Sequence, residues 1–243
     1  MRAEPAKTSS SNPEVLRDLG FTLIELMVVI GVIGLLLSIL LPVISKVRTS
    51  AFKLKCAHNL KQAHLAIQMY LNENDSIYPA AEDPQPDGYW LWMGRWRKLI
   101  QKHLGQQVTE ENPSVLVCPQ DTADRGGQES FSYAYSMTFY HSSQQINQMD
   151  SVEDTYLFAR PSIPQKSSNV ARPSGKILIG EWYSNHLPVN GDNGWWCWEG
   201  ARNFLFADGS ILFVKVSDIK AARDSLPDAN LTYDGIKGID LPR

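Results

Sequence analysis

The chain begins with a mostly polar stretch, residues 1–20, and then becomes apolar. From Leu26 to Ile44 every residue is apolar apart from one serine, two glycines and one proline. About 20 apolar residues in a helix cross a hydrocarbon core of ~30 Å, so this run predicts a membrane-spanning helix. Glu25 stands at its start. A carboxylate at membrane depth costs roughly 2.5–3.5 kcal/mol, which predicts a function and a partner for this side chain.

After Pro42 the apolar positions follow a helical period. They recur at steps of three and four, at Phe52, Cys56, Leu60, Ala63, Ile67 and Tyr70. Such a stripe is typical of a helix docked on a core, and the turn formers of "NENDSIYP" end it. We therefore predict one helix from Phe21 to about Asn74. Its first half (21–44) lies in lipid or against sister helices, its second half (45–74) packs on a head, and Pro42 predicts a kink.

The remaining chain divides into an irregular part and a β-rich part. Residues 75–130 are rich in Pro, Gly, Asp and Trp, and we expect one short helix near Arg95–Leu104. Residues 131–243 carry strand patterns, including a period of two. The candidate strands are "FSYAYSMTFY" (131–140), "TYLFA" (155–159) and "KILIGEW" (176–182).

The clearest β-structure is "NFLFADGSILFVKV" (203–216). Asp208-Gly209 between two apolar runs predicts a hairpin with a two-residue type I′ turn. Pairing outward from this turn sets four side chains on one face, which we assign to the core under the helix: Phe204, Phe206, Ile211 and Phe213. The expected fold class is α+β, a long N-terminal helix packed on a C-terminal antiparallel β-sheet.

Composition and motifs restrict the function. The 243 residues, 43% apolar and 20% charged, are enough for one domain plus an appendage. A net charge of −3 gives no basic face, so no nucleic-acid partner is expected. The sequence has no GxSxG, HExxH, P-loop or GxGxxG motif, and we do not expect an enzyme.

Residues 1–20 differ from a secretory signal, in which a shorter apolar stretch is followed by a small-residue cleavage site. The small residue Gly20 precedes the apolar run instead. Two interpretations stay open on physical grounds: a leader removed by processing, and the cytoplasmic tail of an uncleaved single-pass anchor. A literal count of Lys and Arg favours a cytoplasmic head, because three precede the run and five follow it by residue 61. Large downstream domains, however, translocate largely regardless of charge.

The stretch "GFTLIELMVVIGVIGLLLSILLP", from Gly20 to Pro42, resembles the processing site and first helix of type IV prepilins and type II secretion pseudopilins. The resemblance implies that a prepilin peptidase cuts between Gly20 and Phe21 and N-methylates Phe21. Residues 1–20 would then be the leader, and Glu25 the fifth residue of the mature chain. It also implies a pilin-like fold, with the leader in the cytoplasm and the head in the periplasm.

Cleavage accounts for Glu25. It creates an α-amine, with an ordinary pKa of ~7.7–8, at the start of an apolar helix. An amine and a carboxylate are each costly alone in hydrocarbon, and pairing them lowers that cost. By the resemblance, the Phe21 amine that pairs with Glu25 belongs to a neighbouring subunit in a filament.

The hairpin also resembles the H-x9-DG signature of a large group of prepilin-like proteins. "ARNFLFADGS" matches its asparagine and its Asp-Gly pair, at Asn203, Asp208 and Gly209, but Trp198 stands where the signature has histidine. "CAHNLKQAHLAIQMYLNENDSIYP" and "VLVCPQD" resemble the helix after the membrane and the Cys-Pro segment of that group.

Three cysteines become relevant once the head is placed in an oxidising compartment. Cys56 lies on the docked face of the helix and Cys118 opens a turn, so we predict a Cys56–Cys118 disulfide, with Cys197 left over. The alternative is three buried thiols.

Calcium is a second candidate feature, because some pseudopilins hold this ion near their C-terminal sheet; no other cofactor is expected. Calcium takes six to eight oxygen ligands. The candidates here are Asp192, Asn193, Asp208 and Asp234, and ordinary loop chemistry is the alternative for them.

We thus expect a structural subunit that is anchored in the inner membrane and then assembled into a periplasmic or surface filament. Its partners would be prepilin peptidase, inner-membrane lipid and other pilin or pseudopilin subunits, identical or different. The filament would belong to a type II secretion or type IV pilus system. The alternative function is a membrane-anchored protein that binds glycan or a surface partner through Trp-rich loops, at Trp90–Trp96 and Trp195–Trp198. The alternative interpretation of these tryptophans is that they pack locally beneath loops.

Overall fold

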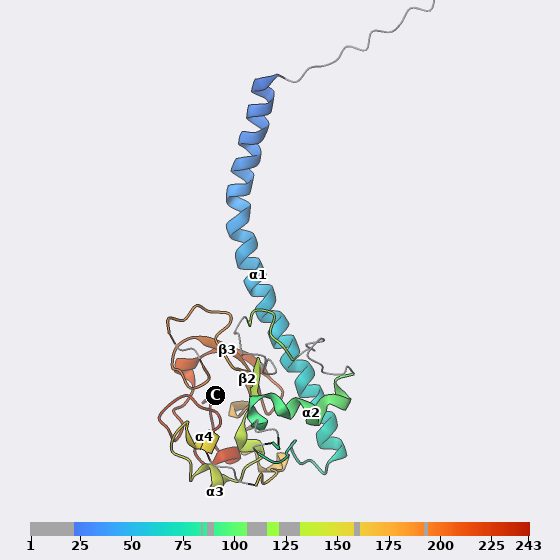
Figure 1. Ribbon diagram of the computed structural model, residues 1–243, viewed down its shortest axis with the longest axis vertical. Coiled ribbons are helices and arrows are strands. Elements are labelled where there is room, and N and C mark those ends of the chain that lie inside the picture. Colours follow the sequence, from blue (N-terminus) through green and yellow to red (C-terminus); the bar gives the residue numbers. More distant parts are fainter. Residues whose placement is uncertain are drawn as a thin grey trace, which may run out of the picture. The chain divides into compact units, whose positions relative to one another are not determined.

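The computed structural model describes residues 22–83, 85–86, 90–105, 116–121, 132–157, 161–191 and 194–243 (Figure 1). Its α-helices are α1 (Leu23–Glu73), α2 (Trp96–Ile100), α3 (Ser143–Ile146) and α4 (Asp154–Leu157). Its strands are β1 (Tyr133–Tyr135), β2 (Ile177–Glu181), β3 (Ala201–Phe206) and β4 (Ile211–Lys215). A π-helical turn, η1, spans Leu91–Arg95, and the 3-10 turns are η2 (Gln101–His103), η3 (Met137–Phe139), η4 (Ser167–Asn169), η5 (Pro173–Gly175), η6 (Val216–Asp218) and η7 (Gly235–Lys237). The chain divides into two compact units. The first ends at Lys46, and the second, the head, spans Val47–Arg243.

Helix α1 confirms the predicted long helix. It continues through Pro42, and within the described residues it is the one helix long and apolar enough to cross a membrane. The part of α1 up to Lys46 belongs to the first unit. The second half belongs to the head, where it lies along one side (Figure 1).

The second half of α1 buries the stripe that its sequence predicts. Cys56, Leu60, Ala63 and Ile67 have no exposed surface. A polar residue shares this face: Asn59 is buried and donates from Nδ2 to the carbonyl oxygen of Val117 at 2.9 Å. Polar contacts as well as apolar packing therefore hold this half of α1 against the rest of the head.

The head contains a four-stranded antiparallel sheet in the order β1-β2-β3-β4. Together with α1 it confirms the α+β class, and β2 confirms the strand predicted in "KILIGEW". The first candidate strand was predicted too long: β1 ends at Tyr135. Ser136 then accepts a hydrogen bond from the N–H of Thr138 and starts the turn η3.

"TYLFA" was wrongly predicted as a strand. Its described residues form part of α4. The carboxylate of Asp154 accepts the N–H groups of Ser151 and Asp150, at 3.0 and 2.7 Å, so local capping selects a helical turn over an extended conformation. The helix expected near Arg95–Leu104 begins earlier, with η1, and continues as α2 and η2.

The β3–β4 hairpin exists, but its predicted register was wrong by one residue. Leu205 pairs with Ile211, and Asn203 with Phe213. The loop thus has three residues, with Gly209 at φ +83°, the position at which such loops use glycine. A slip of one residue reverses the faces of one strand relative to the other.

The corrected register also reverses the face that was assigned to the residues of β3. The Asn203 side chain donates to the carbonyl oxygen of Lys53 on α1, so Asn203 and Leu205 face the helix, whereas Phe204 and Phe206 lie on the opposite face. Phe213 is 38% exposed and lies under the ammonium of Lys53. Phe213 pairs with Asn203 and so lies on the helix-facing side, as does Ile211, which pairs with Leu205. The assignment to the side under the helix was therefore wrong for Phe204 and Phe206, which are buried on the opposite face.

Most tryptophans form an internal aromatic core. Trp92 stacks on Trp182 with ring centroids 4.9 Å apart, and Trp182 also contacts Trp195 and Trp196, at 6.0 and 5.2 Å. Trp96 is fully buried. The two Trp-rich segments of the sequence thus meet at Trp182, inside the head.

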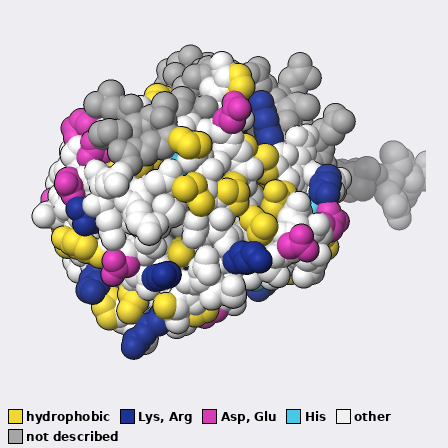
Figure 2. All heavy atoms as spheres, turned by 90° about the horizontal axis from the view of Figure 1, so that it is seen from below, with side chains coloured by type: hydrophobic (Ala, Val, Ile, Leu, Met, Phe, Trp, Pro, Cys, Tyr) yellow, Lys and Arg dark blue, Asp and Glu magenta, His cyan; other side chains and the backbone are white. Residues whose placement is uncertain are grey.

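The C-terminal segment is fixed to β2 by buried charges. One carboxylate oxygen of Asp240 accepts the N–H of Ile177 at 2.7 Å and lies 3.1 Å from the ammonium of Lys176. Burial lowers the pKa of Lys176, and burial raises the pKa of nearby Asp228 to about 7. The guanidinium of Arg243 lies 4.3 Å from the ring centroid of Phe206 and covers that face of the sheet. Figure 2 shows the molecule from below, where apolar side chains lie among charged side chains of both signs.

The Gly209 turn provides a test of the contact between hairpin and helix. A methyl group on Gly209 would meet the His64 imidazole of α1. Gly209→Ala is therefore expected to lower the free energy of unfolding by about 2–4 kcal/mol, combining left-handed strain with overpacking. Urea unfolding followed by tryptophan fluorescence measures this loss.

Gly105→Ala is the matched control. Gly105 also has a positive φ, +67°, but no residue that the structure describes lies within 4 Å of its added methyl group. It is expected to lose only about 1 kcal/mol. Equal losses in the two variants would contradict the role of the His64 contact.

Candidate functional site: the start of α1 and the cluster beneath it

Thr22 and Glu25 close the start of α1 with reciprocal hydrogen bonds. The N–H of Thr22 donates to Glu25 Oε2 at 2.9 Å, and the N–H of Glu25 donates to Thr22 Oγ1 at 3.3 Å. The Thr22 hydroxyl also donates to Glu25 Oε2, at 2.7 Å. This is a capping box, which satisfies backbone N–H groups that a helix start leaves without partners. The sequence carried its signal, Thr-x-x-Glu before an apolar run, and our sequence analysis missed it.

The rest of the predicted assembly segment is an exposed apolar surface. Every large apolar side chain from Leu23 to Ile44 is at least 45% exposed. Among the described residues, none lies within 4 Å of a methyl group added to Gly31 or Gly34. Pro42 lies inside α1, while Gly20 and Phe21 lie outside the described residues. In water such a surface is strongly unfavourable, so it requires hydrocarbon or other helices.

A second, interrupted apolar stripe lies on the outer face of α1 in the head, with His58 and Lys61 between its two ends. Val47, Leu54, Leu65 and Met69 are 51–69% exposed. Their spacings of 7, 11 and 4 residues place them on one side of the helix. Cys56, at nine residues from Val47, is on the opposite side and is buried. The head half of α1 therefore has two apolar faces, and the head covers one of them.

Beneath the buried face lies the disulfide that the sequence analysis predicts. Cys56 of α1 and Cys118 are joined, with their Cα atoms 5.2 Å apart. Cys197 lies outside this bond and is partly exposed. The bond links α1 to the segment before β1, across 62 residues of sequence.

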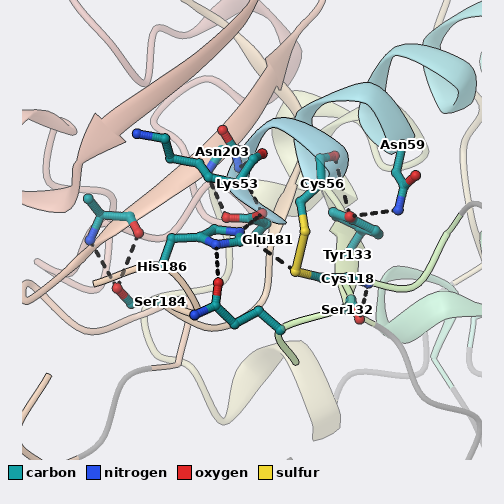
Figure 3. A network of polar contacts seen from close by, with 12 residues as sticks. Lys53, Cys56, Asn59, Cys118, Ser132, Tyr133, Glu181, Ser184, His186 and Asn203 are labelled. Carbon is teal, nitrogen blue, oxygen red and sulfur yellow. Dashed lines mark hydrogen bonds and ion pairs between the residues drawn. A yellow bond between two sulfur atoms is a disulfide. The ribbon is translucent and has the colours of Figure 1, made fainter. Parts of the chain in front are cut away.

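Two further residues complete this cluster, and the sequence analysis did not find them (Figure 3). Glu181 ends β2, and one of its carboxylate oxygens, Oε1, lies 2.9 Å from His186 Nε2. The same ring nitrogen lies 3.6 Å from Cys118 Sγ. Asn203 donates to both oxygens of Glu181, from its backbone N–H at 2.8 Å and from Nδ2 at 2.9 Å. The spacing of Glu181 and His186 matches no motif, so only the fold brings them to the cysteines.

The four calcium candidates are not brought together by these contacts. Asp192 and Asn193 lie outside the described residues. Asp208 Oδ1 accepts from Ser210, and Asp234 Oδ1 accepts from Asn147. Asp208 thus stabilises its own turn, Asp234 contacts the residue that follows α3, and a calcium site stays a prediction.

Comparison with known proteins adds one finding. Residues 16–41 match the family model of the prokaryotic N-terminal methylation motif. With the long apolar helix α1, this match fits a type IV prepilin-like protein. The chain matches no curated protein and no solved structure. The match covers the N-terminal segment alone, so the head is interpreted from its own geometry.

The disulfide predicts a labelling pattern for the chain purified in air. Unfolded without reductant, it should take up one equivalent of iodoacetamide, on Cys197, because Cys56 and Cys118 are bonded to each other. After reduction it should take up three. Cys56→Ser is the control, since it releases Cys118 and should give two labels without reductant. Peptide mass spectrometry locates the labels, and three labels before reduction would contradict the pairing.

Proposed function

We propose that the chain is a structural subunit, cleaved by prepilin peptidase between Gly20 and Phe21 and assembled through α1 into a periplasmic or surface filament. The filament belongs to a type II secretion or type IV pilus system. The observation that carries this proposal is the start of α1: a methylation motif on a helix whose apolar side chains are exposed all round, with a carboxylate at its first turn.

The first half of α1 has two environments in this proposal. Before assembly, the helix lies in the inner membrane with the leader in the cytoplasm and the head in the periplasm. After assembly, sister helices replace the lipid around the exposed side chains of residues 23–44. Both environments keep this apolar surface out of water.

The capping box explains how Glu25 is tolerated before assembly. Its carboxylate accepts from the N–H and hydroxyl of Thr22 and lies at the positive end of the helix dipole. These contacts are hydrogen bonds, and they leave the negative charge uncompensated. In the filament, the methylated amine of Phe21 from a neighbouring subunit supplies the opposite charge.

The outer stripe of α1 extends the same packing into the head. Val47, Leu54, Leu65 and Met69 are large apolar side chains that the head leaves exposed on one side of the helix. An exposed stripe of this kind marks an interaction surface, and other α1 helices have the matching composition. It therefore supports contact between subunits along both halves of α1.

The alternative, a binding protein with Trp-rich loops, has less support. Trp92, Trp96, Trp182 and Trp195 are at most 4% exposed. Trp198 is 40% exposed. A sugar platform needs several exposed rings, whereas most of these rings pack against one another inside the head.

Processing gives the first test. Coexpression with an active prepilin peptidase should yield a chain that begins at Phe21 and is heavier by one methyl group on its amine. Intact-mass measurement and N-terminal peptide sequencing read this out, with an inactive peptidase as control. A mature chain that begins at any other residue would contradict the proposed site.

The two functions of Glu25, capping and charge pairing, can be separated. Glu25→Gln keeps a residue that fits the capping box but removes the charge. It should be cleaved normally and should lower incorporation into filaments at least tenfold, measured by immunoblot of sheared or crosslinked filaments.

Thr22→Ala is the matched variant. It removes the cap, which lowers the stability of the helix by about 1 kcal/mol, and it retains the charge of Glu25. Its incorporation should stay within about twofold of the parent chain. If Glu25→Gln assembles normally while Thr22→Ala does not, Glu25 acts as a cap and the charge pairing is wrong.

A further inference from the structure

Four side chains with metal-ligand atoms meet beneath α1 (Figure 3). One ligand atom each from Cys56, Cys118, Glu181 and His186 lies within 4.8 Å of the others, and all four residues are buried. They come from α1, from the segment before β1, from the end of β2 and from the loop after it. Within the described residues, this is the one such group of three or more.

The disulfide explains the two cysteines but not the buried pair beside them. Nδ1 of His186 lies 2.9 Å from the amide oxygen of Gln120, and Nε2 lies 2.9 Å from a carboxylate oxygen of Glu181. Both neighbours are acceptors. Nε2 thus lies close to two other atoms that can ligate a metal, the Glu181 oxygen and, at 3.6 Å, the Cys118 sulfur.

The geometry around Nε2 suits a metal ion. Zinc binds sulfur at ~2.3 Å and imidazole nitrogen at ~2.0–2.1 Å in tetrahedral sites, which places the two ligand atoms ~3.6 Å apart. His186 Nε2 and Cys118 Sγ are 3.6 Å apart. The thiolate sulfurs would also have to separate from each other, which requires breaking their bond.

The outer atoms of the same residues already have the partners that a metal site needs. Gln120 faces Nδ1 of His186, and Asn203 donates twice to Glu181. Ligating histidines and carboxylates are commonly oriented by contacts of this kind. His186 Nε2 is thereby directed toward Cys118 Sγ, and Glu181 Oε1, which accepts from Asn203 Nδ2, lies beside Nε2.

We propose that the Cys56–Cys118 disulfide is the oxidised form of a metal site, and that the reduced chain binds one divalent ion of the zinc class through Cys56, Cys118, His186 and Glu181. A thiol or phosphine reductant supplies two electrons, the S–S bond breaks, and two protons from water complete two thiols. Zinc binding releases these protons and leaves two thiolates. Two sulfurs and one imidazole select zinc over calcium or magnesium. This inference is independent of filament assembly.

The test uses the full chain in detergent, with Cys197→Ser to remove the third thiol. The anaerobically reduced protein is titrated with Zn²⁺ in competition with a chromogenic chelator. It should bind one Zn²⁺ per chain, and bound zinc should protect both thiols from a disulfide reagent. With Co²⁺ in place of Zn²⁺, thiolate-to-metal charge-transfer bands should appear. The air-oxidised protein should bind no zinc.

His186→Gln should weaken zinc binding at least tenfold, since changing an outer-shell residue alone costs 10–100-fold. His141→Gln is the matched control, because His141 forms another buried pair, with Asp83, at 3.3 Å; it should bind zinc as the parent does. The proposal is overturned if the reduced parent binds no zinc, if its thiols stay reactive with zinc present, or if the two histidine variants bind equally. The first two measurements use the parent alone and do not depend on how the variants fold.

Discussion

The structure depends on one constraint: α1 carries more apolar surface than the head can cover. The head buries the side of α1 that holds Cys56, Leu60 and Ile67, and it leaves the opposite stripe and the whole first half exposed. Since apolar surface of this size is unfavourable in water, the helix is complete only in contact with lipid or with other helices. The Cys56–Cys118 disulfide and the Asn59 hydrogen bond hold the covered side in place, and Glu25 lies at the start of the uncovered half.

The parts of the fold that follow from local chemistry could be predicted from the sequence. The apolar run and the stripe after Pro42 have helical periods, so the helix and its buried side were recognisable. β2 and the Asp208-Gly209 hairpin were recognisable for the same reason, because run length and turn residues lie within a few positions of each other. The pairing of Cys56 with Cys118 needed only the docked face and an oxidising compartment.

The remainder depended on contacts between distant residues. Both two- and three-residue hairpin loops accept Asp-Gly, so these two residues alone did not fix the register that β3 and β4 adopt. Neighbouring residues likewise cannot show that Glu181 and His186 lie beside the cysteines, because four separate segments form that cluster. The helical turn at Asp154 was missed for a different reason: its capping residues were in the sequence, but the short apolar run was given more weight.

The contact between Asp240 and the first residue of β2 sets an order of events during biosynthesis. The N–H of Ile177 and the ammonium of Lys176 have this carboxylate as a partner only after residue 240 has been made. At roughly 5–20 residues per second, Ile44 leaves the ribosome about 10–40 s earlier. The apolar helix thus meets the membrane while the sheet is still incomplete. In the orientation proposed above, the head then crosses the membrane as an unfolded chain, and its cysteines first meet each other on the far side.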